Sequence, residues 1–154
     1  MKADNLQEEI LIQLEAMAIV IDELLALQQD VASREPTLRE KTAAAGFLAQ
    51  FYNGIENIMK RISNFHDVSL PTGETWHVEL FQQFTAPSHP KLPVLFIDEL
   101  ANSLAPYRRF RHVVFHSYGF QLEWEKMVGG VKGVSNVFNQ FQASLSAYLD
   151  TISG

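Results

Sequence analysis

Three long segments carry apolar residues at helical spacing, and this periodicity constrains the fold more than any other feature of the sequence. In residues 4–33, apolar side chains return every three or four positions between acidic and amide residues. That spacing is typical of a helix with one buried face. Residues 37–68 and 121–152 repeat the pattern, and no segment shows the two-residue alternation of a strand. The sequence therefore predicts an all-α fold.

A proline and a capping motif separate the first two helices. Glu35-Pro36 should end the first helix, because proline disfavours helical geometry in the residue before it. Thr37 and Glu40 stand at the spacing of a capping box, which marks the start of the second helix. Since the connection is short, the two long helices should be antiparallel neighbours.

Prolines and glycines also divide the second half of the chain. They predict a turn over 69–73, a short helix over 76–84, a loop over 86–93 and a helix over 94–104. Pro106 should break or kink the chain after that. The next helix should end at Gly119, in the left-handed conformation that glycine tolerates. Gly129, Gly130 and Gly133 predict either a kink or a close helix contact in the last helix.

The length and composition favour one domain spanning residues 1–154. With 47% apolar residues, 154 residues are enough to form one sizeable core. We expect an antiparallel bundle of four main helices plus a short extra helix. The formal net charge of -6 is the reverse of what general nucleic-acid affinity requires, so any RNA site must be a local basic patch.

The cysteine content, the first residues and the apolar runs of the sequence bear on the location of the protein and on membrane association. The chain has no cysteine, which excludes disulfides and thiolate metal sites. Its first residues are charged and lack the layout of a signal peptide. The most apolar run, residues 16–27, is interrupted by Asp22 and Glu23 and is too short to span a membrane. We expect no membrane span and a cytoplasmic location.

Positive charge is concentrated in residues 108–116, which we call the basic cluster. It contains three arginines and two histidines: Arg108, Arg109, Arg111, His112 and His116. Apolar residues recur through the same segment at three- and four-residue steps, which predicts an amphipathic helix: Tyr107, Phe110, Val114 and Tyr118. A titratable imidazole beside fixed guanidinium groups is suited to handling a phosphodiester.

Two plainer interpretations of the cluster compete with this one. Cationic residues in the last turn of a helix are ordinary, and each stabilises by roughly 0.3–1 kcal/mol. His112 and His116 also stand four apart, a spacing that can bind zinc from one helix face. No third ligand stands at motif spacing and the arginines would repel a cation, so we expect no metal. His77 and His89 should be ordinary surface histidines, and His66 a residue at a helix end.

The segment Arg111, four residues, His116, one residue, Tyr118 resembles the Arg-x4-6-His-x-Tyr signature of HepT-type proteins. These belong to the HEPN superfamily of small helical ribonucleases and nucleotide-binding proteins. The resemblance implies a HEPN-like bundle and a metal-independent endoribonuclease, the toxin of a toxin–antitoxin pair. It implies that Arg111 and His116 are catalytic, with RNA as substrate and no cofactor. His112 holds the polar position after the arginine, and Arg109 and Arg108 would support the site.

The same resemblance implies two partners. The antitoxin would be an MNT-type nucleotidyltransferase that silences the toxin by attaching AMP to Tyr118. The second partner would be another copy of the chain, because HEPN motifs meet across a dimer cleft. The sequence agrees, since Arg111 and His116 are about 140° apart on an ideal helix, which argues against a full site within one chain.

Two alternatives remain open. The chain could be a non-catalytic HEPN module that binds a nucleotide or docks a nucleotidyltransferase. It could also be a structural helical protein in which the basic cluster only ends a helix and Tyr118 belongs to the core.

Overall fold

The predicted bundle of four main helices and one short helix is confirmed by a computed structural model, which describes residues 2–153. The elements are α1 (Lys2–Asp30), α2 (Leu38–Phe65), α3 (Trp76–Gln83), α4 (Asp98–His116), the 3-10 turn η1 (Gly119–Gln121) and α5 (Trp124–Ile152). Within residues 2–153, extended pairing is limited to one isolated bridge between Thr85 and Phe96. No helix in this range is long and apolar enough to cross a membrane.

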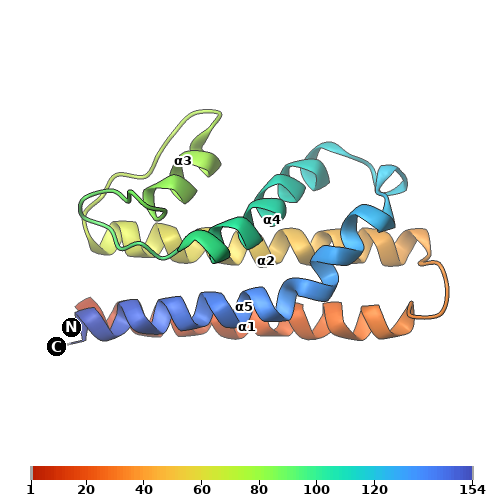
Figure 1. Cartoon of the computed structure of the whole chain (residues 1–154), viewed down its shortest axis with the longest axis horizontal. Coiled ribbons are helices and arrows are strands. Elements are labelled where there is room, and N and C mark those ends of the chain that lie inside the picture. Colours follow the sequence, from red (N-terminus) through yellow and green to blue (C-terminus); the bar gives the residue numbers. More distant parts are fainter. Residues whose placement is uncertain (1, 154) are drawn as a thin grey trace.

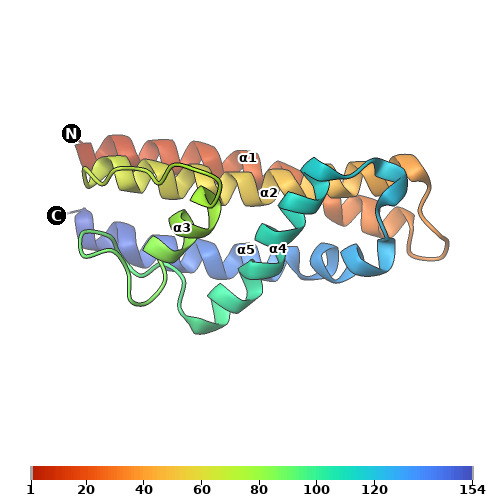
Figure 2. The same cartoon turned by 90° about the horizontal axis from the view of Figure 1, so that it is seen from above.

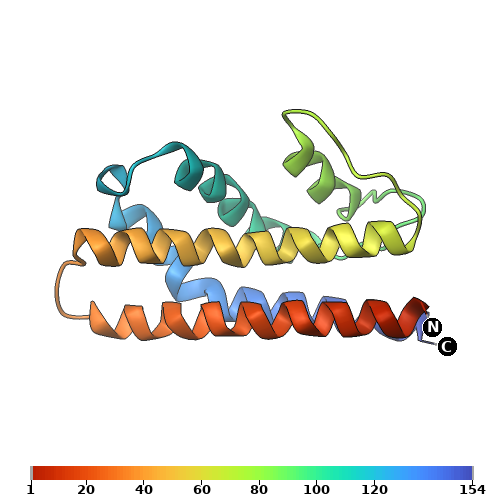
Figure 3. The same ribbon diagram turned by 180° about the vertical axis from the view of Figure 1, so that it is seen from behind.

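The centre of the bundle is α2, which contacts every other element. Figure 1 shows α1 running antiparallel beside it, as predicted, with α5 alongside α1. The elements α3 and α4 lie on the opposite side of α2, and the view from behind in Figure 3 agrees. Figure 2 shows α4 crossing obliquely over the long helices. The elements α3 and α4 therefore form a separate layer on α2 (Figure 1 and Figure 3).

The predicted start of α2 is confirmed in detail. The Thr37 hydroxyl accepts the Glu40 N–H at 3.2 Å, and the Glu40 carboxylate accepts the Thr37 N–H at 2.9 Å. Arg34 adds an ion pair to Glu40 at 2.7 Å. The Arg34 guanidinium and the Thr37 backbone lower the pKa of Glu40 to about 2. This capping box fixes the turn between α1 and α2.

Close packing holds α1 against α2. The inward side chains of both helices are fully buried, among them Ile10, Leu24 and Ile55. At Gly54, a Cβ atom would lie 2.5 Å from the Cγ atom of Met17. The glycine that weakens helix propensity in α2 is therefore what lets the two helices approach.

Before the basic cluster, the predicted helix start at residue 94 is wrong, and of the break or kink predicted at Pro106 the break is wrong. Residues 94–97 are not helical, because the N–H groups of Leu95 and Phe96 bond to the Phe84 carbonyl at 3.0 and 3.2 Å. Pro106 does not break the chain, since α4 continues through it to His116. Core packing on both sides of the proline holds the helix, with Leu104 and Tyr107 buried.

The end of α4 also differs from the prediction. The helix ends at His116, and Ser117 is extended, with φ -131° and ψ 150°. Gly119 has no positive φ and instead starts η1. A Cβ at Gly119 would collide with the Thr42 hydroxyl on α2, so the glycine serves close approach. Because the helix stops early, Tyr118 leaves the apolar stripe and is 72% exposed.

The glycines of α5 lie where the helix curves and where α4 contacts it. Figure 1 shows α5 curving from the level of α2 to that of α1. Tyr107 packs into this part of the helix, with its hydroxyl donating to the Gly130 carbonyl at 2.7 Å. The same hydroxyl lies 3.6 Å from where a Gly133 Cβ would stand. That distance is ordinary van der Waals contact, so a methyl group at Gly133 would fit against α4.

Candidate functional site

The basic cluster lies along one wall of a cavity of about 850 Å³ between α4 and the start of α3. The α4 wall contains all five residues of the basic cluster together with an aromatic ring: Arg108, Arg109, Arg111, His112, Phe115 and His116. Residues 73–78, which lead into α3, form the opposite wall. The five residues predicted from the sequence are therefore brought to one concave surface.

Arg111 is fixed by a set of polar contacts from two other helices. Its Nε donates to the Asn53 Oδ1 at 2.5 Å and lies 3.4 Å from the Glu56 Oε1. Its Nη1 lies 3.1 Å from the His77 Nε2, and its guanidinium carbon sits 4.7 Å from the centre of the Phe115 ring. Such a guanidinium is pre-positioned, so little ordering is needed when an anion binds.

Glu56 of α2 contacts both Arg111 and His77, and it was not among the site residues predicted from the sequence. Its side chain is 3% exposed, and its Oε2 lies 2.5 Å from the His77 Nδ1. A buried carboxylate requires partners, and Arg111 and His77 supply them. A signal was available in the sequence, because Glu56 falls at helical spacing among buried positions of α2: Tyr52, Met59 and Ser63.

His77 was predicted to be an ordinary surface histidine, and that prediction is wrong. It lies in the first turn of α3, its side chain is 27% exposed, and both ring nitrogens have partners. No local sequence pattern identifies it, because its partners stand 21 and 34 residues away along the chain.

Two further features surround Arg111. The Nε of Arg108 is buried without a hydrogen-bond partner within the described residues, and its guanidinium carbon lies 5.2 Å over the Phe81 ring. The hydroxyl of Tyr52 is likewise buried and unpaired within this part of the chain. Burial raises the pKa of Tyr52, and the nearby Glu56 adds to the rise. Arg108 therefore adds a fixed positive charge to the cavity wall, with its Nε–H unpaired within the described residues.

His112 and His116 are exposed on the cavity wall, with ring centroids 4.2 Å apart. The expected angular separation of Arg111 and His116 does not place them on different surfaces. A guanidinium extends far from its backbone, and both side chains line this one cavity in a single chain. The angle on an ideal helix is thus no argument against a site within one chain.

Tyr118 lies outside the cavity, just beyond the end of α4. Its ring stacks on that of Phe120, with centroids 5.7 Å apart and planes 6° apart. Both rings are exposed, Phe120 by 69%. The interpretation of Tyr118 as a core residue is therefore wrong.

The described residues offer no obvious metal centre. Within residues 2–153 there is no group of three or more histidine, aspartate or glutamate side chains that could hold a metal ion. His112 and His116 instead share their cavity with three arginines, whose charge opposes cation binding.

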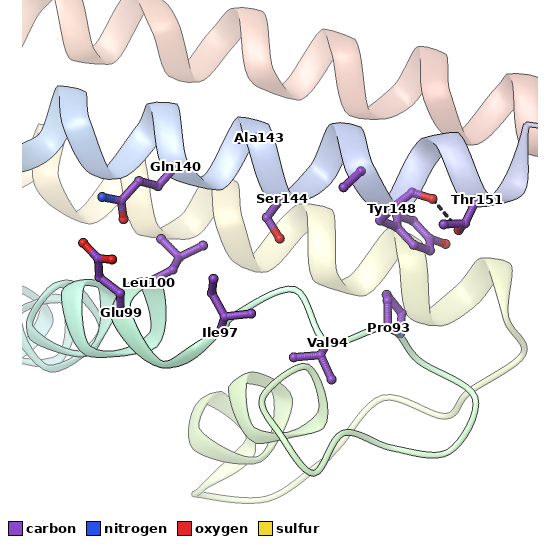
Figure 4. Close-up of a pocket in the computed structure, with 11 residues that line it drawn as sticks. Pro93, Val94, Ile97, Glu99, Leu100, Gln140, Ala143, Ser144, Tyr148 and Thr151 are labelled. Carbon is purple, nitrogen blue, oxygen red and sulfur yellow. Dashed lines mark hydrogen bonds between the residues drawn. The ribbon is translucent and has the colours of Figure 1, made fainter.

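A second cavity, of about 650 Å³, lies between α5 and the segment that leads into α4 (Figure 4). No residue of the basic cluster lines it. Three of its hydroxyl groups are already paired: Ser144 donates to the Leu95 carbonyl, Thr151 to the Tyr148 carbonyl, and the Tyr148 hydroxyl lies 2.6 Å from the His66 Nε2. It has a mostly apolar lining and lacks the cationic groups of the first cavity.

Comparison with known proteins identifies the family of the chain. A family model described as HepT-like protein matches residues 43–152. The matched range includes α3, α4, α5 and most of α2, and thus both walls of the first cavity. No curated protein and no solved structure matches the chain.

Proposed function

Since the chain belongs to the HepT-like protein family, we propose that it is a metal-independent endoribonuclease and the toxin of a HepT/MNT-type toxin–antitoxin pair. The observation that carries this proposal is the pre-positioned Arg111, which a buried carboxylate holds in the same cavity as the exposed His116. An oriented guanidinium beside an available imidazole is the minimal equipment for cleaving RNA without a metal.

The proposed reaction is transfer of the phosphoryl group to the neighbouring ribose hydroxyl. The 2′-oxygen attacks the adjacent phosphorus, the bond to the 5′-oxygen breaks, and the products carry a 2′,3′-cyclic phosphate and a 5′-hydroxyl. Arg111 stabilises the charge that develops on the phosphoryl oxygens. His116 transfers a proton as general acid or base.

The other cluster residues have supporting roles in this proposal. Arg108 and Arg109 attract the phosphate backbone to an otherwise acidic protein, because they add fixed charge on the same cavity wall. His112 orients His116 through the ring contact of 4.2 Å or contacts phosphate itself.

Two protein partners complete the proposal. A second copy of the chain would form a homodimer, supported by exposed apolar side chains on α4 and η1: Val113, Phe115 and Phe120. An MNT-type nucleotidyltransferase would attach AMP to Tyr118. Of the four tyrosines, only Tyr118 is exposed, while Tyr52, Tyr107 and Tyr148 are buried.

A non-catalytic module that binds a nucleotide or docks a nucleotidyltransferase is the alternative. The net charge of -6 favours it, because extended RNA is repelled by the surface outside the cluster. Binding of a single nucleotide needs only the cavity.

Cleavage of a single-stranded RNA in excess EDTA separates these functions. Wild type should remain active and give cyclic phosphate and 5′-hydroxyl ends, identified by mass spectrometry. His116→Ala should lose roughly 10²–10⁴-fold in kcat, whereas His89→Ala, outside the cavity, should behave as wild type. Loss of activity in EDTA that zinc restores would make His112 and His116 metal ligands. Nucleotide binding without cleavage would favour the non-catalytic module.

A further inference from the structure

The cavity contains a third histidine on the wall opposite the motif. His77 comes from the start of α3, while His112 and His116 come from α4, and all three line the same space. Arg111 reaches between the walls, because its Nη1 lies 3.1 Å from the His77 Nε2. A phosphate bound to Arg111 would therefore have an imidazole on each side.

The contacts of His77 identify its tautomer. Its Nδ1 lies 2.5 Å from a Glu56 carboxylate oxygen, which can only accept, so Nδ1 carries a hydrogen and donates. Its Nε2 faces an arginine N–H, which can only donate, so Nε2 presents a lone pair. His77 thus stands as a neutral imidazole whose acceptor nitrogen is directed at the arginine that would bind phosphate.

Glu56 gives this imidazole the support that a general base requires. The carboxylate is 3% exposed and holds the ring through Nδ1. It would stabilise the imidazolium that forms when Nε2 takes a proton, as a buried carboxylate does for a histidine base in hydrolases. Within the part of the chain that the structure describes, no carboxylate holds His112, whose ring is exposed and rests on that of His116.

We propose that His77 is the general base of the reaction and His116 its general acid, an inference that rests on the ribonuclease function proposed above. The Nε2 of His77 exchanges its hydrogen bond from Arg111 for one from the 2′-hydroxyl. It takes that proton as the bond between the 2′-oxygen and phosphorus forms. The bond between phosphorus and the 5′-oxygen breaks, and the 5′-oxygen takes a proton from the His116 imidazolium. Solvent then returns a proton to His116 and removes one from His77.

A substrate with sulfur in place of the bridging 5′-oxygen separates the two histidines. A thiolate leaves without protonation, so loss of the general acid matters little on this substrate, whereas loss of the base still matters. On ordinary RNA, His77→Ala and His116→Ala should each lose roughly 10²–10⁴-fold in kcat. On the sulfur substrate, His116→Ala should regain most of its activity and His77→Ala should not.

His77→Gln distinguishes a base from a residue that only positions Arg111. Glutamine can donate to Glu56 and accept from Arg111 but cannot take up a proton, so kcat should fall as in His77→Ala while KM stays near that of wild type. His89→Gln is the matched control outside the cavity. Circular dichroism and thermal unfolding verify that each variant is folded.

Three results would overturn the proposal. Near wild-type cleavage by folded His77→Gln would leave His77 a positioning residue, and rescue of His77→Ala by the sulfur substrate would make it the acid. In both cases the ribonuclease function stands. No cleavage by wild type of any RNA would overturn the ribonuclease function and the role of His77 together.

Discussion

Among single residues, Glu56 determines how strongly substitutions in the site will affect the stability of the fold. It contacts both Arg111 and His77 while almost fully buried. Removing one partner of a buried pair leaves a desolvated charge, which costs about 3–5 kcal/mol. Substitutions of Arg111 will therefore lower stability as well as activity, so kinetic comparisons must use conditions in which each variant is folded.

The role of Tyr118 follows from its exposure. Because its ring lies outside the core, Tyr118→Phe should leave folding and cleavage unchanged. With a cognate nucleotidyltransferase and ATP, wild type should gain the mass of AMP and lose ribonuclease activity, since the added bulk and negative charge stand close to the cavity. Tyr118→Phe should gain nothing and stay active, while His116→Ala should accept AMP. AMP found by mass spectrometry on Tyr107 or Tyr148 would contradict the assignment.

His66 predicts a pH dependence of stability near neutrality. Burial lowers its pKa below the ordinary 6.5, and its Nε2 lies 2.6 Å from the Tyr148 hydroxyl. The unfolded chain then binds the proton more readily than the folded one, so stability is complete above about pH 7 and falls as pH decreases through 6.5. Thermal unfolding from about pH 7 to about pH 5 should show a falling Tm. In His66→Gln this part of the pH dependence should be absent; an unchanged slope would contradict the role of His66.

Among the elements, the junction between α4 and α5 depends on Gly119. A Cβ there would collide with the Thr42 hydroxyl, which is bonded to the Leu38 carbonyl at 2.9 Å. Gly119→Ala should therefore push η1 away from α2 and destabilise by about 1–3 kcal/mol, the usual cost of overpacking. Gly46→Ala is a matched control, because nothing lies within 4 Å of that Cβ. It should stabilise α2 by about 0.5–1 kcal/mol. Urea unfolding measures both, and equal effects would contradict the close approach.

For the whole molecule, the proposed homodimer gives the last prediction. Val113, Phe115 and Phe120 expose 43%, 59% and 69% of their surface beside the basic cluster, and a second copy would cover them. Wild type should sediment as a dimer, and Val113→Glu should shift it towards monomer and weaken cleavage. Ile19→Glu places the same charge at an exposed apolar position of α1 and should change neither. A wild-type monomer, or a dimer with the two His116 residues on opposite outer faces, would exclude a shared cleft.

Local sequence patterns determined most of the architecture. The apolar period of α1, α2 and α5 requires helices with one buried face, and the Thr37 and Glu40 capping box requires a helix start where it is observed. These features depend on interactions within a few residues, which a sequence displays directly. The family signature likewise lies within residues 111–118, so the sequence alone was enough to identify the basic cluster.

Only the tertiary structure determined which residues contact the signature and which conformation the chain adopts beside it. Pro106 and Gly119 were misjudged because packing against other helices, and not local preference, fixed their conformations. The partners of Arg111 come from α2 and α3, up to 58 residues away, and neither Asn53 nor His77 belongs to a recognisable motif. Apart from Glu56, whose spacing places it among the buried positions of α2, these partners leave no periodic pattern in the sequence. The sequence could therefore supply the arginine and the histidine, but only the fold brought a buried carboxylate and a second imidazole to them.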